Sequence, residues 1–355
     1  MLAVGVMRPK HLITVLAGMI LITCDSGTGL VRTSDKAPLK PLDDFKADLA
    51  FTCVHEAIPA PSADTDVVFK YAHWLQKNNL YKQDKTVDAE IKRLYRIAAE
   101  NGHFMANINL QNGKFALRNA EHLRLSQQLI DANVATGYYF IGRFLKHGSA
   151  GLEWDQNMAL RYFRKAADMG SADAQYYVGD KLYYINIAPK IVAAMYRCAA
   201  EQGNSEASVA LGVHLKDERH EHEEVLEAFQ LGIAAGSSTS ASLMHEVFSN
   251  PSSNALPYLG QQEDLERADR YKKIGRILTR NFYADPTVPE INEIVPLPPA
   301  KLPAWDGKLQ SVEVWLANVP PPKPTPQLIQ QLAKTKTLDP ATGEPMPSSS
   351  SHSEN

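Results

Sequence analysis

The sequence has few cysteines, no large excess of charge of either sign, and almost no proline along its middle. Its three cysteines, Cys24, Cys53 and Cys198, are too few for a disulfide-rich scaffold and match no zinc-site spacing. A formal net charge of −3 argues against a nucleic-acid-binding protein, which usually carries a basic excess. Hydrophobic residues at 44% and charged residues at 22% exclude a wholly disordered chain among these 355 residues.

Motifs of the common hydrolases and nucleotide-binding proteins are also absent. The sequence has no Gly-x-Ser-x-Gly, no His-Glu-x-x-His, no phosphate loop and no His-x-Lys-x-x-x-x-Asp of phospholipase D enzymes. The best candidate metal cluster is the run His214, His220, Glu221, His222 and Glu223. We interpret it as a solvated charged loop between two helices, because its spacing fits no metal site. We therefore expect no cofactor, no metal and no enzymatic activity.

A single long apolar run lies near the N-terminus. The twelve uncharged residues 12–23 follow Arg8 and Lys10 and end at Cys24. A bilayer-spanning helix needs about 20 residues, so the pattern predicts an export signal, residues 1–23, that begins at Met1 or Met7. The stretch Leu-Ile-Thr-Cys at 21–24 resembles a bacterial lipoprotein signal, which implies lipidation of Cys24. The alternatives are a plain secretory signal and a buried N-terminal helix.

The residues after Cys24 have the composition of a flexible tether, rich in Ser, Gly, Thr, Pro and charge from residue 25 to residue 40. Asp25 resembles the inner-membrane retention signal of enteric lipoproteins. We therefore expect a periplasmic protein that is anchored to a membrane, with the inner membrane favoured. Removal of the signal takes away Arg8 and Lys10 and leaves a more acidic mature chain.

The middle of the chain is repetitive. Five similar stretches share one position, which is glycine in four of them and asparagine in the other: Gly102, Asn133, Gly170, Gly203 and Gly236. The intervals of 31, 37, 33 and 33 residues indicate stacked helical hairpins. The sequence therefore predicts an all-α fold, an α-solenoid over residues 64–250.

The composition of each repeat agrees with a helix that ends in a left-handed turn. Leu160, Phe163, Ala166 and Ala167 have the spacing of one apolar helix face. Glycine then provides the left-handed cap, for which asparagine is the best substitute. Proline is absent between residues 62 and 250 except for Pro189, which we place in a loop.

Residues 141–170 resemble the Sel-1-like repeat, a relative of the tetratricopeptide repeat. The residues that match its pattern are Ile141-Gly142, Leu145, Gly148, Lys165-Ala166-Ala167 and Gly170. This resemblance implies a solenoid of tetratricopeptide-like helical hairpins, with the clearest match at the centre of the array.

The C-terminal part has a different composition. Residues 251–284 form a linker and one further long helix at 265–281, and 14 of the 22 prolines follow from Pro286 onward. We expect residues 285–340, the strap, to be extended, with a short helix between Trp305 and Trp315. Its apolar residues favour packing along the solenoid over presentation as a docking ligand. Residues 341–355 are expected to be a disordered tail.

Cys53, in the N-terminal segment of residues 24–63, and Cys198 allow three interpretations. They are a catalytic thiol with a bystander, two buried apolar residues, or a single disulfide in an oxidising periplasm. We favour the disulfide, which would tie the N-terminal segment to a repeat helix and close a long loop.

Tyrosines cluster on the first helix of each central repeat, which in helical solenoids lines the concave face. Tyrosine is a good interface anchor because it buries a large area at low rotamer cost. Packing between repeats is the alternative for each ring. The candidate partner-binding residues are Tyr138, Tyr139, Arg143, Tyr176, Tyr177, Asp180, Tyr183 and His214.

The whole mature chain also resembles a family of Sel-1-like-repeat lipoproteins of Gram-negative bacteria. The resemblance rests on FTCVHEA, QYYVGDKL, RYKKIGRIL, VPEINEIVPLPPAKLPAWDGK and LDPATGEP. Members are associated with type VI secretion phospholipase effectors as periplasmic immunity proteins. The resemblance implies a stoichiometric protein inhibitor of a secreted phospholipase. A periplasmic scaffold for an envelope or signalling complex is the alternative, and an enzyme such as a repeat hydrolase ranks last.

Overall fold

The computed structural model describes residues 50–112, 119–219, 222–251 and 258–347, all of which belong to one compact unit. The export signal, Cys24, the tether and residues 348–355 lie outside the described residues. Within the described part every regular element is a helix, and one isolated β-bridge joins Leu338 and Pro345. None of these helices combines the length and the apolar character needed to cross a bilayer.

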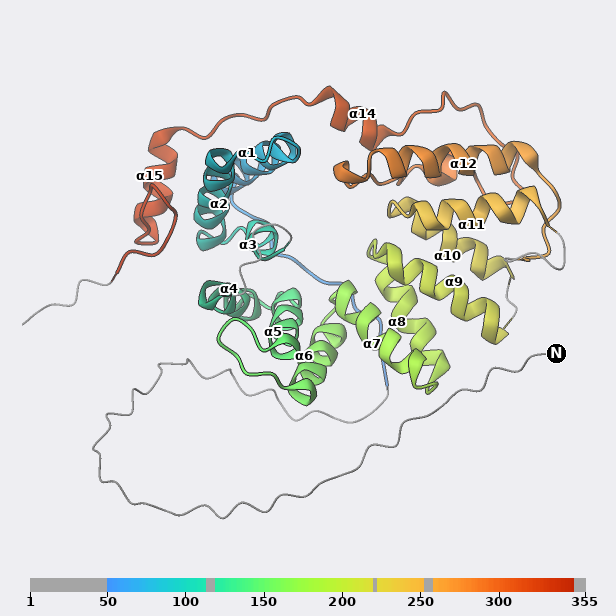
Figure 1. The fold of residues 1–355 in the computed structure, drawn as a ribbon, viewed down its shortest axis with the longest axis horizontal. Coiled ribbons are helices and arrows are strands. Elements are labelled where there is room, and N and C mark those ends of the chain that lie inside the picture. Colours follow the sequence, from blue (N-terminus) through green and yellow to red (C-terminus); the bar gives the residue numbers. More distant parts are fainter. Residues whose placement is uncertain (1–49, 113–118, 220–221, 252–257, 348–355) are drawn as a thin grey trace, which may run out of the picture. The chain divides into compact units, whose positions relative to one another are not determined.

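Helices that follow each other in the chain pack side by side, as the all-α prediction requires (Figure 1). The chain passes through them in the order α1 (Ala63–Asn79), α2 (Lys85–Glu100), α3 (Phe104–Gln111), α4 (Ala120–Asp131), α5 (Thr136–His147), α6 (Gln156–Asp168), α7 (Ala172–Tyr184), α8 (Pro189–Glu201), α9 (Ser205–Arg219), α10 (His222–Ala234), α11 (Ser238–Ser249) and α12 (Leu265–Arg280). The predicted α-solenoid of helical hairpins is confirmed.

The five predicted turns are built alike. The shared position has a left-handed backbone, with φ of 84° at Gly102, 58° at Asn133, 108° at Gly170, 87° at Gly203 and 91° at Gly236. In each turn the next residue's N–H donates to the carbonyl five residues earlier at 2.8–3.0 Å. This bond satisfies a carbonyl that the helix end would leave free. The predicted role of glycine, and of asparagine in its place, is therefore confirmed.

The residue after the turn usually caps the next helix. The side chains of His103, Ser171, Asn204 and Ser237 each accept a hydrogen bond from the N–H three residues later. The second turn has no such side chain, because Ala135 precedes α5. There the carboxylate of Glu56 accepts from the Thr136 N–H at 2.6 Å and from its Oγ1 at 2.8 Å. The N-terminal segment thus supplies the cap that the repeat lacks.

Replacing Glu56 with alanine should lower the free energy of unfolding by about 1–2 kcal/mol, the usual cost of losing a helix cap. Glu56→Gln keeps a side-chain acceptor and should cost less. Urea unfolding followed by circular dichroism measures both variants. Equal stability of Glu56→Ala and the wild type would show that α5 does not need this cap.

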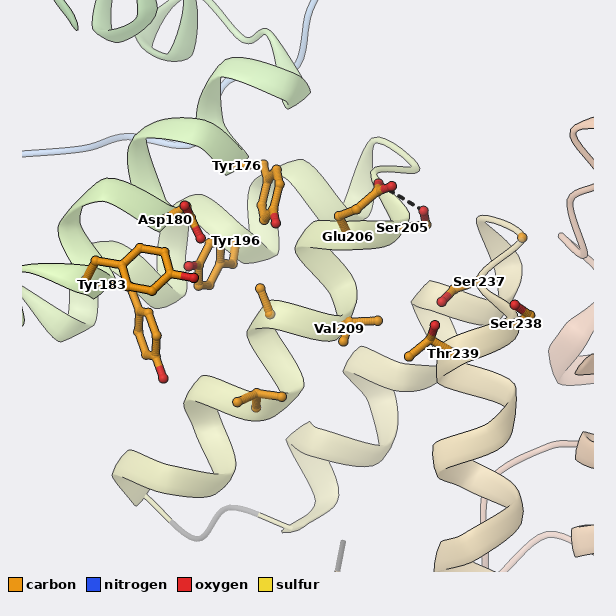
Figure 2. Close-up of a pocket in the computed structure, with 14 residues that line it drawn as sticks. Tyr176, Asp180, Tyr183, Tyr196, Ser205, Glu206, Val209, Ser237, Ser238 and Thr239 are labelled. Atoms are coloured by element: carbon orange, nitrogen blue, oxygen red, sulfur yellow. Dashed lines mark hydrogen bonds between the residues drawn. The ribbon is translucent and has the colours of Figure 1, made fainter. Parts of the chain in front are cut away.

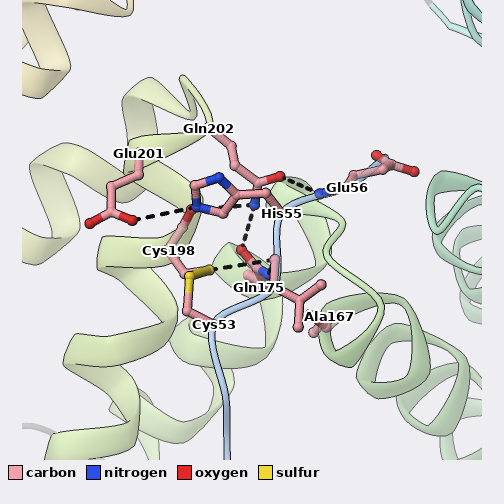
Figure 3. The surroundings of a disulfide bond; sticks show 9 residues. Cys53, His55, Glu56, Ala167, Gln175, Cys198, Glu201 and Gln202 are labelled. Atoms are coloured by element: carbon pink, nitrogen blue, oxygen red, sulfur yellow. Dashed lines mark hydrogen bonds and ion pairs between the residues drawn. A yellow bond between two sulfur atoms is a disulfide. The ribbon is translucent and has the colours of Figure 1, made fainter. Parts of the chain in front are cut away.

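The N-terminal segment runs extended along the helix ends and is joined to α8 by a disulfide between Cys53 and Cys198 (Figure 3). The two Cα atoms are 5.6 Å apart, and the residues are separated by 145 positions in sequence. The Val54 carbonyl accepts from Gln175 Nε2 at 2.8 Å, and the Glu56 N–H donates to Gln202 Oε1 at 2.8 Å. Of the three interpretations of these cysteines, the structure has the disulfide.

Gly170 is required for a second reason besides its left-handed backbone, which is the close approach of the N-terminal segment. A Cβ atom at this residue would lie 2.6 Å from the Glu56 backbone nitrogen and 2.6 Å from the His55 carbonyl carbon. The N-terminal segment can therefore approach this turn only because no side chain is present. Gly236 has the same relation to the strap, since a Cβ there would overlap the Pro286 carbonyl oxygen.

The first part of the strap is fixed to the last helices of the array. The Val288 N–H donates to the Ala234 carbonyl at 2.9 Å, and Gln230 Nε2 donates to the Val295 carbonyl at 2.6 Å. Buried Arg267 of α12 donates to the Ala300 carbonyl at 2.9 Å and to the Pro296 carbonyl. The short helix α13 (Ile291–Ile294) lies in this part and packs against α10.

The second part of the strap returns to the first helices (Figure 1). Helix α14 (Gln310–Ala317) meets α1, where Lys77 Nζ donates to the Trp315 carbonyl at 2.5 Å. Helix α15 (Pro326–Thr335) packs against α2 and inserts Ile329, Leu332 and Ala333 into the same core. Many apolar residues of the strap thus pack along the array, as we expected, although Val314, Leu316 and Val319 are exposed. Helix α14 is the short helix that the sequence predicts.

Five expectations need correction. The strap is not extended throughout, because residues 326–335 form α15, and Pro326 suits the first turn of a helix. Pro189 begins α8 rather than lying in a loop, because the first helical position needs no N–H donor. Leu160 is 38% exposed, and Tyr162 of the same helix is buried instead. His214 lies inside α9 and is buried, so it is not part of a solvated loop. Residues 341–347 are not a free tail, since Arg96 Nη1 donates to the Thr342 carbonyl and lies 2.8 Å from Glu344 Oε1.

Candidate partner-binding site

A pocket of about 530 Å³ lies where four helices of three successive repeats meet (Figure 2). Helix α7 supplies Tyr176, Asp180, Tyr183 and Tyr184, and α8 supplies Tyr196. Helix α9 supplies Ser205, Glu206, Val209, Ala210 and Val213, and the turn into α11 supplies Gly236, Ser237, Ser238 and Thr239. The pocket therefore has a tyrosine wall and a hydroxyl wall, with α9 as its floor.

The tyrosine wall is held by ring contacts. Tyr176 lies 6.0 Å from Tyr196 between ring centroids, and Tyr183 contacts Tyr184 edge-on at 5.8 Å. Tyr196 is 1% exposed and Tyr184 is 74% exposed, so the wall runs from the core to solvent. Burial raises the pKa of Tyr176 and of Tyr196, so both phenols stay neutral at physiological pH.

Two carboxylates give the pocket its charge. Asp180 is half-buried and forms no hydrogen bond or ion pair with any described residue. Burial raises its pKa, an effect that neighbouring Lys181 partly offsets. Glu206 is exposed and accepts a hydrogen bond from Ser205 Oγ at 3.0 Å. No Lys, Arg or His lines the pocket in the described part of the chain, so its net charge is negative.

The structure sorts the predicted partner-binding residues into two groups. Tyr176, Asp180 and Tyr183 line the pocket, and His214 lies buried behind them, 5.8 Å from the Tyr183 ring. The others do not line the pocket. Tyr177 packs between repeats, which was the alternative for each ring, whereas Tyr138 and Tyr139 pack against α6 of their own repeat. Their contacts are Tyr138 with Tyr162, Tyr139 with Phe163, Tyr177 with Phe163, and Arg143 with the Tyr139 ring.

Several lining residues were not predicted. Tyr196 lies on the second helix of its repeat, whereas we expected partner-binding tyrosines on the first helices. Glu206 is an acid in the first turn of a helix, a common position that carries no signal of binding. The serines at 237 and 238 and Thr239 follow a glycine turn, where small polar residues serve as caps.

A second cluster lies at the disulfide. One ligand atom from each of Cys53, His55 and Cys198 falls within 4.8 Å of the other two. Both sulfur atoms are bonded to each other, so neither is a thiolate that could bind a metal. His55 Nε2 instead lies 3.4 Å from Glu201 Oε2 (Figure 3). The cluster therefore serves to fix the N-terminal segment.

Comparisons with known proteins agree with the fold. Residues 240–346 match a family described as a domain of unknown function, DUF6396, and this region contains most of α11, all of α12 and the whole strap. No curated protein matches the sequence. The match covers less than half of the chain, so it concerns the C-terminal region alone.

Three solved structures from Pseudomonas aeruginosa share the architecture. Protein PA5086 has 26% identity and a TM-score of 0.52, over 70% of this chain and 95% of its own. The immunity protein PA5087 has 21% identity and a TM-score of 0.51 over the same shares. The immunity protein PA5088 has 23% identity and a TM-score of 0.54, over 70% of this chain and 94% of its own. These similarities show a common all-α repeat fold.

Proposed function

We propose that this protein is a non-catalytic immunity protein that binds and neutralises a type VI secretion phospholipase effector in the periplasm. Three considerations support the proposal. The sequence resembles Sel-1-like-repeat lipoproteins associated with such effectors, and two proteins with the same fold are described as immunity proteins. The pocket has the character of a protein-binding surface. Helical-repeat arrays of this kind generally act by binding other proteins.

The observation that carries the proposal is the tyrosine-and-carboxylate pocket. Interfaces that bind tightly depend on a few anchors in desolvated hollows, and tyrosine is among the commonest of these anchors. Charged groups around them raise the association rate and select the partner. The pocket combines both features, since Asp180 and Glu206 stand among four tyrosines.

The proposed mechanism is stoichiometric occlusion, in which no covalent bond changes. The array binds the effector and blocks its active site or its access to lipid. Lipidation of Cys24 would hold the inhibitor at the membrane surface, where a phospholipase acts. The rigid attachment of the N-terminal segment and the strap would lower the cost of ordering the surface on binding.

A scaffold for an envelope or signalling complex is the second candidate. The same repeat architecture favours it, because stacked hairpins offer an extended surface for several partners. The gene neighbourhood separates the two candidates. An adjacent gene for a phospholipase D-type effector, with a spike-protein gene beside it, is expected for an immunity protein and not for a general scaffold.

Co-expression with the neighbouring lipase, directed to the periplasm, tests the proposal. Cells that make both proteins should survive, and a stable complex should elute as one species on gel filtration. A lipase variant without its catalytic residue serves as the control for toxicity and should still form the complex. Lysis of the co-expressing cells, together with separate elution of the two proteins, would overturn the immunity function.

A further inference from the structure

Some tyrosine rings of α5 and α7 have a Lys or Arg side chain of this protein over them, and others do not. Lys146 Nζ lies 4.9 Å and Lys181 Nζ 5.4 Å from the centroid of the Tyr177 ring. The Arg143 guanidinium lies 5.9 Å from the centroid of the Tyr139 ring. In both places a cation faces the electron-rich side of the ring, an attractive arrangement. Contacts between a tyrosine ring and a cation therefore occur in this array.

The rings of the pocket have no such cation within the described residues. Tyr176, Tyr183 and Tyr184 lie against other aromatic rings, and Tyr176 also packs against buried alanines, although all three lie on the same helix as Tyr177. Asp180 stands among them with no ion pair in the part of the chain that the structure describes. Removing a carboxylate from water without a partner costs free energy. The pocket therefore combines tyrosine rings with a carboxylate, as a cation site does, and no Lys, Arg or His of the described residues lines it.

We propose that the pocket receives an arginine side chain of the partner protein, with its guanidinium against the tyrosine rings and bonded to Asp180. The inference rests on the proposed function, because it assigns the partner residue that the pocket would bind. Glu206 faces the same hollow from α9 and adds a second negative charge near its rim. Ser237 and Thr239 on the opposite wall offer oxygen acceptors for the remaining N–H groups.

Arginine fits this site better than lysine for two reasons. Its planar guanidinium stacks on aromatic rings and pairs with a carboxylate through two parallel hydrogen bonds. It is also hydrated more weakly than an ammonium group and enters a half-buried site at lower cost. The hollow of about 530 Å³ is wide enough to admit a side chain together with part of its backbone.

The first test measures the effect of the carboxylates on the complex. Asp180→Asn should weaken binding of the neighbouring lipase by about tenfold, the cost of losing one charge-assisted hydrogen bond. Asp180→Asn combined with Glu206→Gln should weaken it further. Asp269→Asn, an exposed charge change of the same kind on α12 outside the pocket, serves as the matched control and should bind like the wild type. Wild-type affinity of the double variant would overturn the arginine assignment while leaving the immunity function intact.

The second test does not need the lipase. In a nuclear magnetic resonance titration, N-acetyl-arginine amide should shift the ring signals of Tyr176, Tyr183 and Tyr184 saturably. N-acetyl-citrulline amide, which has the same shape and no charge, should not. The arginine-induced shifts should disappear in Asp180→Asn. Equal responses to the two probes, or no response to either, would overturn the inference, whatever the result of co-expression.

Discussion

Replacing Cys53 with alanine is expected to lower the free energy of unfolding by about 2–5 kcal/mol. The disulfide closes a loop of 145 residues, and a long loop loses much conformational freedom in the unfolded chain when its ends are joined. The substitution also frees the segment that carries Glu56, so the cap of α5 is weakened at the same time. Urea unfolding with and without reductant measures the loss.

The matched control for this prediction is the wild-type protein in reductant. It should unfold at the same urea concentration as Cys53→Ala, whose own midpoint should not respond to reductant. Counting thiols after denaturation gives an independent check in a Cys24→Ser background, where none should react until a reductant is added. Two reactive thiols in the absence of reductant would contradict the disulfide.

Replacing Arg96 with alanine should cost about 3–5 kcal/mol, because it leaves a carboxylate without its partner in a largely buried place. Arg96 Nε lies 2.6 Å from Glu121 Oε1 of α4, and Arg96 Nη1 lies 2.8 Å from Glu344 Oε1 beyond the strap. The Arg96 side chain is 9% exposed and that of Glu121 17%. This arginine therefore joins α2, α4 and the residues that follow α15.

The double variant Arg96→Met with Glu121→Leu tests the origin of that cost. It removes both charges and should recover much of the stability, since the penalty comes from the unpaired carboxylate. Chemical unfolding of the two single variants and the double variant forms the cycle. If the double variant loses as much as the sum of the single ones, the ion pair is not what holds these helices together.

The same pair makes stability depend on pH. Burial alone would raise the pKa of Glu121, but the bonds and charge of Arg96 more than offset burial and hold the pKa below its ordinary value of 4.5. A carboxyl with a lowered folded pKa stabilises the protein above its unfolded pKa, and this stability is lost as the pH falls through the folded value. The wild type should therefore lose more stability than Glu121→Gln as the pH falls below about 4.5.

Local sequence determined the parts of the fold that we could predict. A left-handed turn favours glycine or asparagine, and these residues recur at the five turn positions, so they reveal the repeat without any knowledge of tertiary contacts. The apolar spacing of each helix and the scarcity of proline act at the same short range. The N-terminal segment shows the limit of this approach, because the cap of α5 comes from Glu56, 80 residues earlier in the sequence.

The candidate site was predicted in part for a related reason. Tyr176 and Tyr177 are neighbours in sequence with the same chemistry, yet one lines the pocket and the other packs against Phe163. Adjacent residues on a helix point about 100° apart, so only the position of the next repeat decides which ring is covered. Helix α15 was missed because prolines on both sides suggested extended backbone, although Pro326 suits the first turn of a helix.

The strap has a consequence for how the array comes apart. A linear stack of repeats unravels from its terminal members, since each of these has a neighbour on one side alone. Here residues 286–300 of the strap are bonded to the last helices of the array. The strap then continues to the first helices, where α14 contacts α1 and α15 packs against α2. Both ends of the helical array are therefore in contact with the strap, which couples the unfolding of the first helices to that of the last. Unfolding should therefore be closer to all-or-none than in an open array, and amide hydrogens of α2 and α12 should exchange as slowly as those of central α8.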